Sequence, residues 1–256
     1  MRIAPGERRR NLERAVKFLH DAAKHKARLV ILPEALPFGW MDPGAITEAD
    51  HIPNGASCQL LARAAKETGV SICCGIIERH QERLYNSAVL FSPSGELLLH
   101  HRKINELEIA QSLYSLGDRV GVVDTELGRI GLMICADAFA PGQVISRTLA
   151  LMGAQLIVSP CAWAVPPNFD NNSSPYGQLW IDNYGPVCRD FNIWIAGCSN
   201  VGPIRSGPWA GHKCIGASMV VGPDGNVRAR GPFGEDAEDL VLLDIELPAY
   251  VRPASS

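Results

Sequence analysis

Ala27-Arg-Leu-Val-Ile-Leu-Pro33 is the stretch that decides the fold, because the chain repeats its pattern as Ala154-Gln-Leu-Ile-Val-Ser-Pro160. Each stretch is a short apolar run that follows a segment with helical spacing of its apolar residues, at residues 7–26 in the first half and 141–152 in the second. Such runs are typical of strands that are covered on both faces. We therefore predict a helix–strand unit at corresponding positions of two similar halves.

The parallel between the halves continues along the chain. A second helix–strand pair is predicted in each half, followed by a hairpin with Pro and Gly in its four-residue turn. The first half places these elements at residues 59–68, 70–77 and 84–91 with a turn at 92–95, and the second at 184–190, 192–198 and 214–221 with a turn at 222–225. We see no interdomain linker. The pattern predicts one α/β domain over residues 1–256, with two sheets packed face to face and helices outside.

The composition of the chain argues against several classes of function. The 256 residues are 46% hydrophobic, enough for a full core, and the net charge of −3 predicts neither nucleic-acid nor anionic-membrane binding. No apolar stretch reaches the length of a membrane span, and the polar, basic start is unlike a secretory signal. The eight cysteines lie largely in strand-like runs without Cys-x-x-Cys spacing, so we expect free thiols, no zinc site and a reducing cytoplasm.

Three reactive side chains follow predicted strands. Glu34 ends Leu-Val-Ile-Leu-Pro-Glu, Cys135 ends Gly-Leu-Met-Ile-Cys, and Lys103 lies just beyond the first hairpin. A carboxylate acts as general base toward a thiol, and an ammonium favours the thiolate and stabilises an oxyanion. His100 and His101 offer an alternative base, but they stand before Lys103 rather than at the strand ends. Taken singly each residue is more often structural, and only their joint arrangement predicts nucleophilic acyl transfer without a metal or a histidine.

These segments resemble the Glu–Lys–Cys signature of the nitrilase superfamily of carbon–nitrogen hydrolases. Leu32-Pro-Glu34, His101-Arg-Lys103 and Ile134-Cys-Ala-Asp137 occur in that order, with Tyr85-Asn-Ser-Ala88 and Gly222-Pro-Asp-Gly225 around them. The resemblance covers nearly the whole chain. It implies a four-layer α-β-β-α sandwich, a covalent thioester or thioimidate on Cys135, no cofactor, and homo-oligomers built by stacking sandwiches.

The resemblance also implies further site residues. Many members carry a second glutamate between the lysine and the cysteine; Glu106 and Glu108 both lie there, and we expect Glu108 because it is closer to Tyr114. The backbone N–H of Ala136 is the expected second oxyanion donor. Trp163 lies in a loop-rich segment that is a candidate pocket wall, and we expect it to contact substrate, although an anchoring role in the core is an equal alternative.

The chain departs from the family pattern in two places. Members usually begin with an apolar strand, and Met1-Arg-Ile-Ala-Pro5 leaves no room for one, so we expect that strand to be missing or truncated. Ala136-Asp-Ala-Phe139 lacks the arginine of N-carbamoyl amidohydrolases and the Trp-Glu of nitrilases.

We therefore expect an amidase that releases ammonia from a small primary amide. A nitrilase and an N-carbamoyl amidohydrolase are the alternatives within the same chemistry. A non-catalytic oligomeric scaffold that kept the fold is the alternative from a different class.

Overall fold

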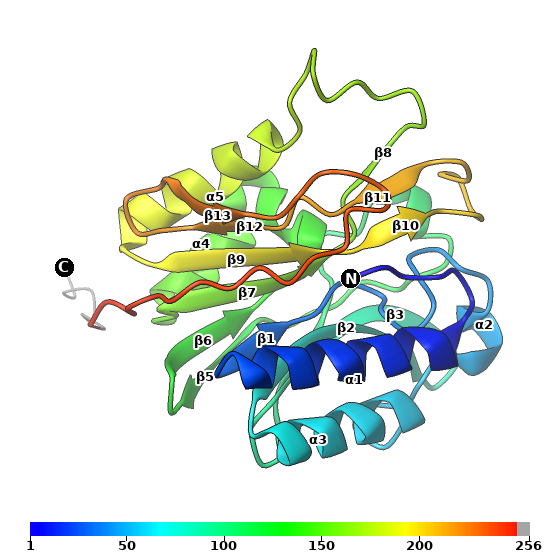
Figure 1. Cartoon of the computed structure of the whole chain (residues 1–256), viewed down its shortest axis with the longest axis horizontal. Coiled ribbons are helices and arrows are strands. Elements are labelled where there is room, and N and C mark those ends of the chain that lie inside the picture. The colour runs from blue at the N-terminus through cyan, green and yellow to red at the C-terminus, as the bar shows by residue number, and fades with distance from the viewer. Residues whose placement is uncertain (250–256) are drawn as a thin grey trace.

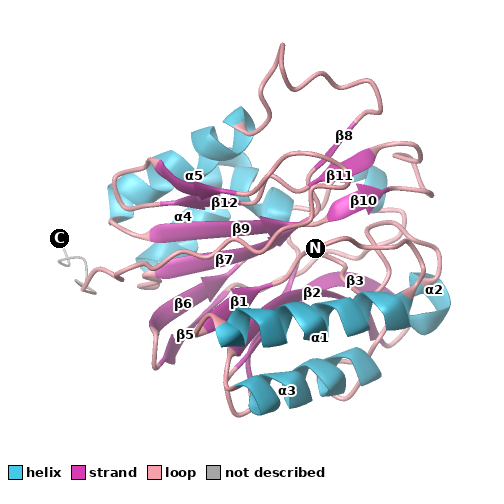
Figure 2. Ribbon diagram, in the orientation of Figure 1, coloured by secondary structure: helices cyan, strands magenta, loops and turns pink. Residues whose placement is uncertain are grey.

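Two β-sheets face each other in the computed structural model, which describes residues 1–249. The first sheet has the strand order β1-β2-β3-β4 and the second β13-β12-β9-β7-β6-β5. Helices α1 and α3 cover the first sheet, and α4 and α5 cover the second, which gives four layers (Figures 1 and 2). The helices are α1 (Arg8–Lys24), α2 (Ala45–Glu48), α3 (Ala56–Thr68), α4 (Val144–Leu151) and α5 (Gln178–Phe191), with 3₁₀ turns η1 (Glu108–Ala110), η2 (Cys135–Phe139) and η3 (Pro141–Gln143).

The strands of the two sheets follow the helix–strand repeat predicted for the two halves of the chain. The first sheet contains β1 (Leu29–Ile31), β2 (Ser71–His80), β3 (Arg83–Phe91) and β4 (Leu97–Arg102). The second contains β5 (Gly121–Thr125), β6 (Gly128–Leu132), β7 (Leu156–Cys161), β9 (Trp194–Ser199), β12 (Met219–Val221) and β13 (Val227–Arg230). β1 pairs in parallel with β2, and β7 pairs in parallel with β9, so the two predicted helix–strand pairs occupy equivalent places in the two halves.

Local sequence explains where the elements end. Gly69 closes α3 with φ +69° and donates its N–H to Ala65 O at 2.8 Å, a left-handed cap that glycine adopts without strain. The predicted second hairpin forms between β12 and β13 through the turn at 222–225, but its first strand is shorter than the predicted residues 214–221. Gly216 and Ala217 both have positive φ, which breaks the run into β11 (Lys213–Ile215) and β12. β11 leaves the sandwich and pairs with β8 (Ala164–Val165) and β10 (Val201–Pro203) in a small third sheet.

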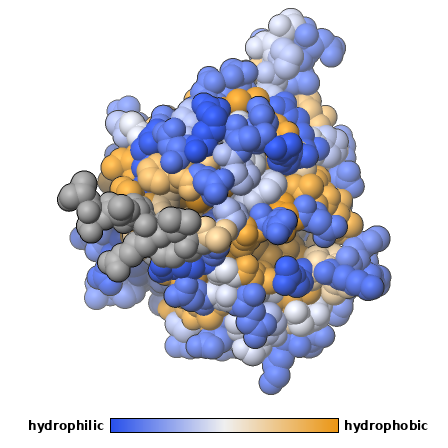
Figure 3. Space-filling view, turned by 90° about the vertical axis from the view of Figure 1, so that its left-hand side faces the viewer, coloured by the Kyte–Doolittle hydropathy of each residue, from blue (hydrophilic) through white to orange (hydrophobic). Residues whose placement is uncertain are grey.

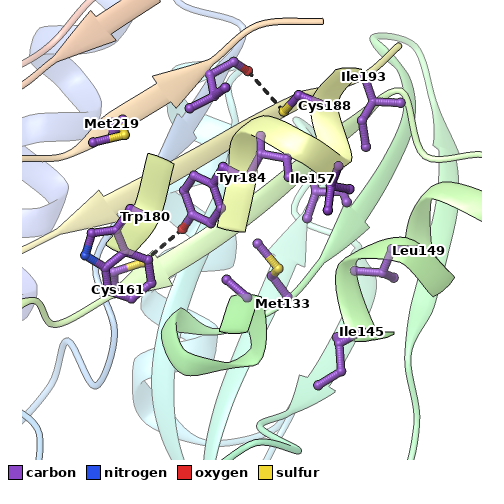
Figure 4. Close-up of a cluster of buried hydrophobic side chains, with 14 of the residues drawn as sticks. Met133, Ile145, Leu149, Ile157, Cys161, Trp180, Tyr184, Cys188, Ile193 and Met219 are labelled. Carbon is purple, nitrogen blue, oxygen red and sulfur yellow. Dashed lines mark hydrogen bonds between the residues drawn. The ribbon is translucent and has the colours of Figure 1, made fainter. Parts of the chain in front are cut away.

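Apolar side chains fill each gap between layers. The inner faces of the two sheets meet through residues such as Leu90, Ile134 and Val158. Between the second sheet and its helices, a cluster around Tyr184 and Leu149 is buried (Figure 4). Burial of this kind contributes about 25 cal/mol for each Å² of apolar surface removed from water.

The N-terminal segment pairs over a short length only. Arg2 forms an isolated parallel bridge with Val201, and Ile3 N–H donates to Val201 O at 2.9 Å. A groove of about 480 Å³ lies between β1 and the extended segment 240–247. The Trp194 indole N–H holds that segment by donating to Glu246 O at 3.0 Å. The face of the molecule in Figure 3 shows hydrophobic residues gathered between hydrophilic ones.

No helix within residues 1–249 is long and apolar enough to cross a membrane.

Candidate active site

Glu34 lies in a turn directly after β1 and is buried. Its backbone N–H donates to Cys161 O at 3.2 Å, which ties the turn to the end of β7 in the opposite sheet. Gly75 of β2 packs against this turn so closely that a Cβ there would lie 2.4 Å from Glu34 Cα. Glycine at position 75 therefore allows the close approach that fixes the carboxylate.

Lys103 follows β4 and points its ammonium at two carboxylates. Lys103 Nζ lies 2.8 Å from Glu34 Oε1 and 3.4 Å from Glu106 Oε2, and all three side chains are buried. Burial disfavours the ammonium, but the charges of Glu106 and Glu34 outweigh it and hold the pKa of Lys103 well above its ordinary value. Lys103 is thus a fixed cation inside the protein.

Glu106, rather than the expected Glu108, is the glutamate that contacts Lys103. Glu106 is 5% exposed and contacts Lys103, whereas Glu108 begins the 3₁₀ turn η1 and is exposed to solvent. The short separation of Glu108 and Tyr114 along the chain did not identify the glutamate that contacts Lys103. Glu106 stands only three residues after Lys103, and the chain turns between them so that their side chains meet.

The charge on Glu106 is poorly compensated. Burial raises its pKa, repulsion by Glu34 adds to this, and the attraction of Lys103 and the indole N–H of Trp40 offset only part of the rise. Its Oε1 makes no hydrogen bond of normal geometry to the residues described here. An incompletely satisfied buried carboxyl is uncommon in structural networks and frequent at functional sites.

Asn86 of β3 bridges the two carboxylates. Its Nδ2 lies 2.6 Å from Glu34 Oε1 and 3.5 Å from Glu106 Oε2, and its backbone carbonyl accepts the Lys103 N–H at 2.8 Å. Asn86 lies within the segment Tyr85-Asn-Ser-Ala88, but we predicted no role for it from the sequence. Its place in the middle of a strand, pointing inward among apolar neighbours, was the available signal.

Cys135 begins the 3₁₀ turn η2 just beyond β6. Its φ of +44° lies in the left-handed region, which costs a non-glycine residue energy and turns the side chain out of the strand direction. The backbone N–H donates to Ser159 Oγ at 3.0 Å. A hydrogen bond with the Cys161 thiol, burial and the nearby Glu34 charge raise the pKa of Cys135 well above its ordinary value, while Lys103 opposes them. Cys135 is therefore held as a neutral thiol, and a base is needed to ionise it.

Asp137 holds this turn in place. Its carboxylate accepts the backbone N–H groups of Ile134, Ile104 and Asn105 at 2.8–3.0 Å, and His101 Nε2 lies 2.8 Å from its Oδ2. These hydrogen bonds to its charged form overcome burial and lower the pKa of Asp137. One carboxylate thus joins the nucleophile turn to the chain that follows Lys103. His101 has partners on both ring nitrogens, because Nε2 faces Asp137 and Nδ1 lies 3.1 Å from Arg119 O, so neither nitrogen is turned toward the Cys135 thiol.

The two remaining predicted residues lie in different surroundings. Ala136 directly follows the nucleophile, and its carbonyl accepts Asn105 Nδ2 at 2.6 Å, which orients this peptide group. Trp163 is 1% exposed and stacks on Trp180 at a centroid distance of 4.4 Å. The expected substrate contact at Trp163 is therefore corrected to packing in the core between the second sheet and its helices. Asn105 and Asp137 were missed as positioning residues because their partners are backbone groups, which sequence patterns do not reveal.

The arrangement brings a partly exposed thiol together with a buried ammonium and two buried carboxyls. Among residues 1–249, no cluster of His, Cys, Asp or Glu is arranged to hold a metal ion. The site residues come from both sheets: Glu34, Asn86 and Lys103 from the first, and Cys135 from the second.

Comparison with known proteins agrees with this geometry. The family model described as carbon–nitrogen hydrolase matches residues 1–252. A nitrilase of Pyrococcus abyssi is 30% identical over 242 residues, covering 93% of this chain and 85% of that protein. The human omega-amidase is 32% identical over 248 residues, covering 93% and 83%. The crystal structure of a carbon–nitrogen hydrolase from Helicobacter pylori G27 shares the fold with a TM-score of 0.80 at 23% identity, covering 90% of this chain and 83% of that one.

Proposed function

This chain belongs to the carbon–nitrogen hydrolase family and is a thiol-dependent enzyme, and on that premise we propose that it releases ammonia from a small primary amide through a thioester on Cys135. The observation that carries the proposal is the buried Glu34–Lys103 pair at 2.8 Å, reached by the nucleophile turn from the opposite sheet. A fully buried pair of this kind is costly to desolvate, which favours a role in function.

Glu34 acts first as general base. It takes the proton from the Cys135 thiol as the sulfur attacks the amide carbon, a step that the raised pKa of Cys135 makes necessary. The carbonyl oxygen becomes an oxyanion, which the Lys103 ammonium and the Ala136 N–H stabilise. Glu34 then gives its proton to the amide nitrogen, the carbon–nitrogen bond breaks, and ammonia leaves.

Water completes the cycle. Glu34 takes a proton from water and the resulting hydroxide attacks the thioester carbon. The carbon–sulfur bond breaks to give the carboxylic acid and the Cys135 thiolate, which takes the proton back from Glu34. Glu106 positions the Lys103 ammonium opposite Glu34 throughout. The net charge of the site is the same before and after the cycle, because the first proton leaves with ammonia and the second, from water, restores the thiol.

The named relatives support an amide over a nitrile without excluding the second. The human relative is an omega-amidase and the Pyrococcus abyssi relative a nitrilase. Nitrile hydrolysis by the same residues passes through a thioimidate and remains the alternative. The absence of an arginine directly after Asp137 argues against an N-carbamoyl substrate with a free carboxylate.

Ammonia release tests this proposal. A panel of primary amides and matched nitriles is incubated with the wild type and with Cys135→Ala. We expect turnover of amides that disappears in the variant. Turnover of nitriles alone would replace the amidase with the nitrilase, and turnover that survives in Cys135→Ala would overturn the role of Cys135.

We also propose that the chain forms a homo-oligomer through α4 and α5. Val144, Leu151 and Leu179 on these helices are large apolar residues, each more than half exposed. A double variant Leu151→Glu/Leu179→Glu is expected to lower the mass measured by light scattering, while Ile46→Glu on α2, equally exposed, leaves it unchanged. A monomeric wild type would contradict this proposal.

A further inference from the structure

Cys161 is a second thiol at the active site that the proposed mechanism does not use. Cys135 lies in the turn after β6 and packs against the buried cluster that contains Cys161. Ser159 Oγ contacts both residues: it accepts the Cys135 N–H at 3.0 Å and lies 3.4 Å from Cys161 Sγ. The nearby Cys161 thiol also raises the pKa of Cys135.

Hydrogen bonds hold the Cys161 sulfur in place. Cys161 Sγ lies 3.2 Å from Ser159 O and 3.4 Å from Ser159 Oγ. It also lies 4.0 Å from the Tyr184 hydroxyl (Figure 4). The carbonyl of Cys161 accepts the Glu34 N–H at 3.2 Å. Cys161 therefore contacts the backbone of Glu34 and shares the Ser159 hydroxyl with Cys135.

We propose that Cys135 and Cys161 form a reversible disulfide when the enzyme meets hydrogen peroxide. Glu34 takes the Cys135 proton, the sulfur attacks one peroxide oxygen, and the oxygen–oxygen bond breaks to give a sulfenic acid; the departing hydroxide takes the proton and leaves as water. The Cys161 thiol then attacks the Cys135 sulfur, its proton joins the leaving hydroxyl, and a second water departs. Two thiols are oxidised and one peroxide is reduced to two waters.

Geometry favours this second step over further oxidation. The Cys135 N–H and the Cys161 thiol both contact Ser159 Oγ, which brings the two residues near enough for a link that spans about 4.4–6.8 Å between Cα atoms. Cys135 is partly exposed and so open to peroxide, whereas Cys161 is buried directly beside it. The disulfide would remove the nucleophile, and so activity, but it would also protect Cys135 from irreversible sulfinic acid.

Peptide mass spectrometry of the full chain tests the proposal without knowledge of the substrate, so its outcome is separate from that of the amidase assay. After peroxide treatment of the wild type, we expect a mass loss of two hydrogens and one linked peptide joining residues 135 and 161, both reversed by dithiothreitol. Cys161→Ser, which keeps the size and polarity of the side chain, should instead accumulate oxygen on Cys135.

Cys198→Ala is the matched control. Cys198 stands on β9, and the strand register pairs it with Pro160, which makes it the neighbouring thiol on the other side of β7. This variant should still form the 135–161 link. On an amide that the wild type turns over, the activity recovered by dithiothreitol should fall on the order of tenfold in Cys161→Ser. A wild type that gains oxygens on Cys135 without the link, or that links Cys161 to Cys198, would overturn the proposal.

Discussion

Two buried carboxylate clusters lie on the same sheet, and they differ in how completely their charges are satisfied. Glu78 of β2 receives Arg102 Nη2 at 2.6 Å on one oxygen, and on the other Ser87 Oγ at 2.6 Å, His100 Nε2 at 2.8 Å and Arg102 Nε at 3.0 Å. Glu106 has long contacts of 3.4 Å from Lys103 and 3.5 Å from Asn86, both on one oxygen, besides the attraction of the Trp40 indole N–H.

The pKa values of Glu78 and Glu106 differ accordingly. Burial opposes ionisation at Glu78, but hydrogen bonds from His100, Arg102 and Ser87 lower its pKa to about 2. Burial and the charge of Glu34 raise the pKa of Glu106. A fully hydrogen-bonded carboxylate stabilises the sheet, whereas a crowded and partly satisfied one is available for proton chemistry and positioning.

The largest difference between the two clusters should appear when each loses its cation. We expect one substitution to lower activity and the other to lower stability. In Lys103→Met the oxyanion loses its cation, so we expect kcat/KM to fall by about 10³ or more. In Arg102→Gln the site keeps its residues, so kcat/KM should stay within about threefold while the free energy of unfolding drops by about 3 kcal/mol. Steady-state kinetics and urea unfolding measure the two quantities. Equal losses of activity in the two variants would contradict this difference between the two clusters.

Acid should weaken the Glu78 cluster selectively. Its folded-state pKa of about 2 lies below the ordinary value of 4.5, so its contribution is present above pH 4.5 and is lost as pH falls toward 2. That contribution amounts to about 3 kcal/mol. Urea unfolding of wild type and Glu78→Gln at several pH values should show a stability difference that shrinks on acidification. A difference independent of pH would contradict the assignment.

The two candidate second glutamates offer a smaller, paired test. Glu106→Gln keeps the shape of the side chain but removes the negative charge that faces Lys103, so we expect kcat/KM to fall by about thirtyfold, or about 2 kcal/mol. Glu108→Gln, on the exposed 3₁₀ turn, should change kcat/KM by less than about twofold. A larger effect of Glu108→Gln would restore the original expectation from sequence.

Sequence alone predicted the repeat of helices and strands well, because apolar runs and helical spacing report directly on burial. It also predicted that Glu34 and Lys103 meet, since both follow strands of one sheet. It placed the second glutamate wrongly, because the turn after Lys103 is set by Asp137 accepting backbone N–H groups, a long-range contact without a sequence pattern. Trp163 was ambiguous for a similar reason: a tryptophan beside a loop packs inward or faces a pocket depending on residues far along the chain.

The covalent intermediate on Cys135 is the central claim, and mass spectrometry after rapid acid quench tests it most directly. During turnover of a primary amide, a peptide containing Cys135 should carry the acyl group of the substrate, and the adduct should be absent from Cys135→Ala. Steady ammonia release by Cys135→Ala, or an acyl group found on another residue of the wild type, would contradict the account.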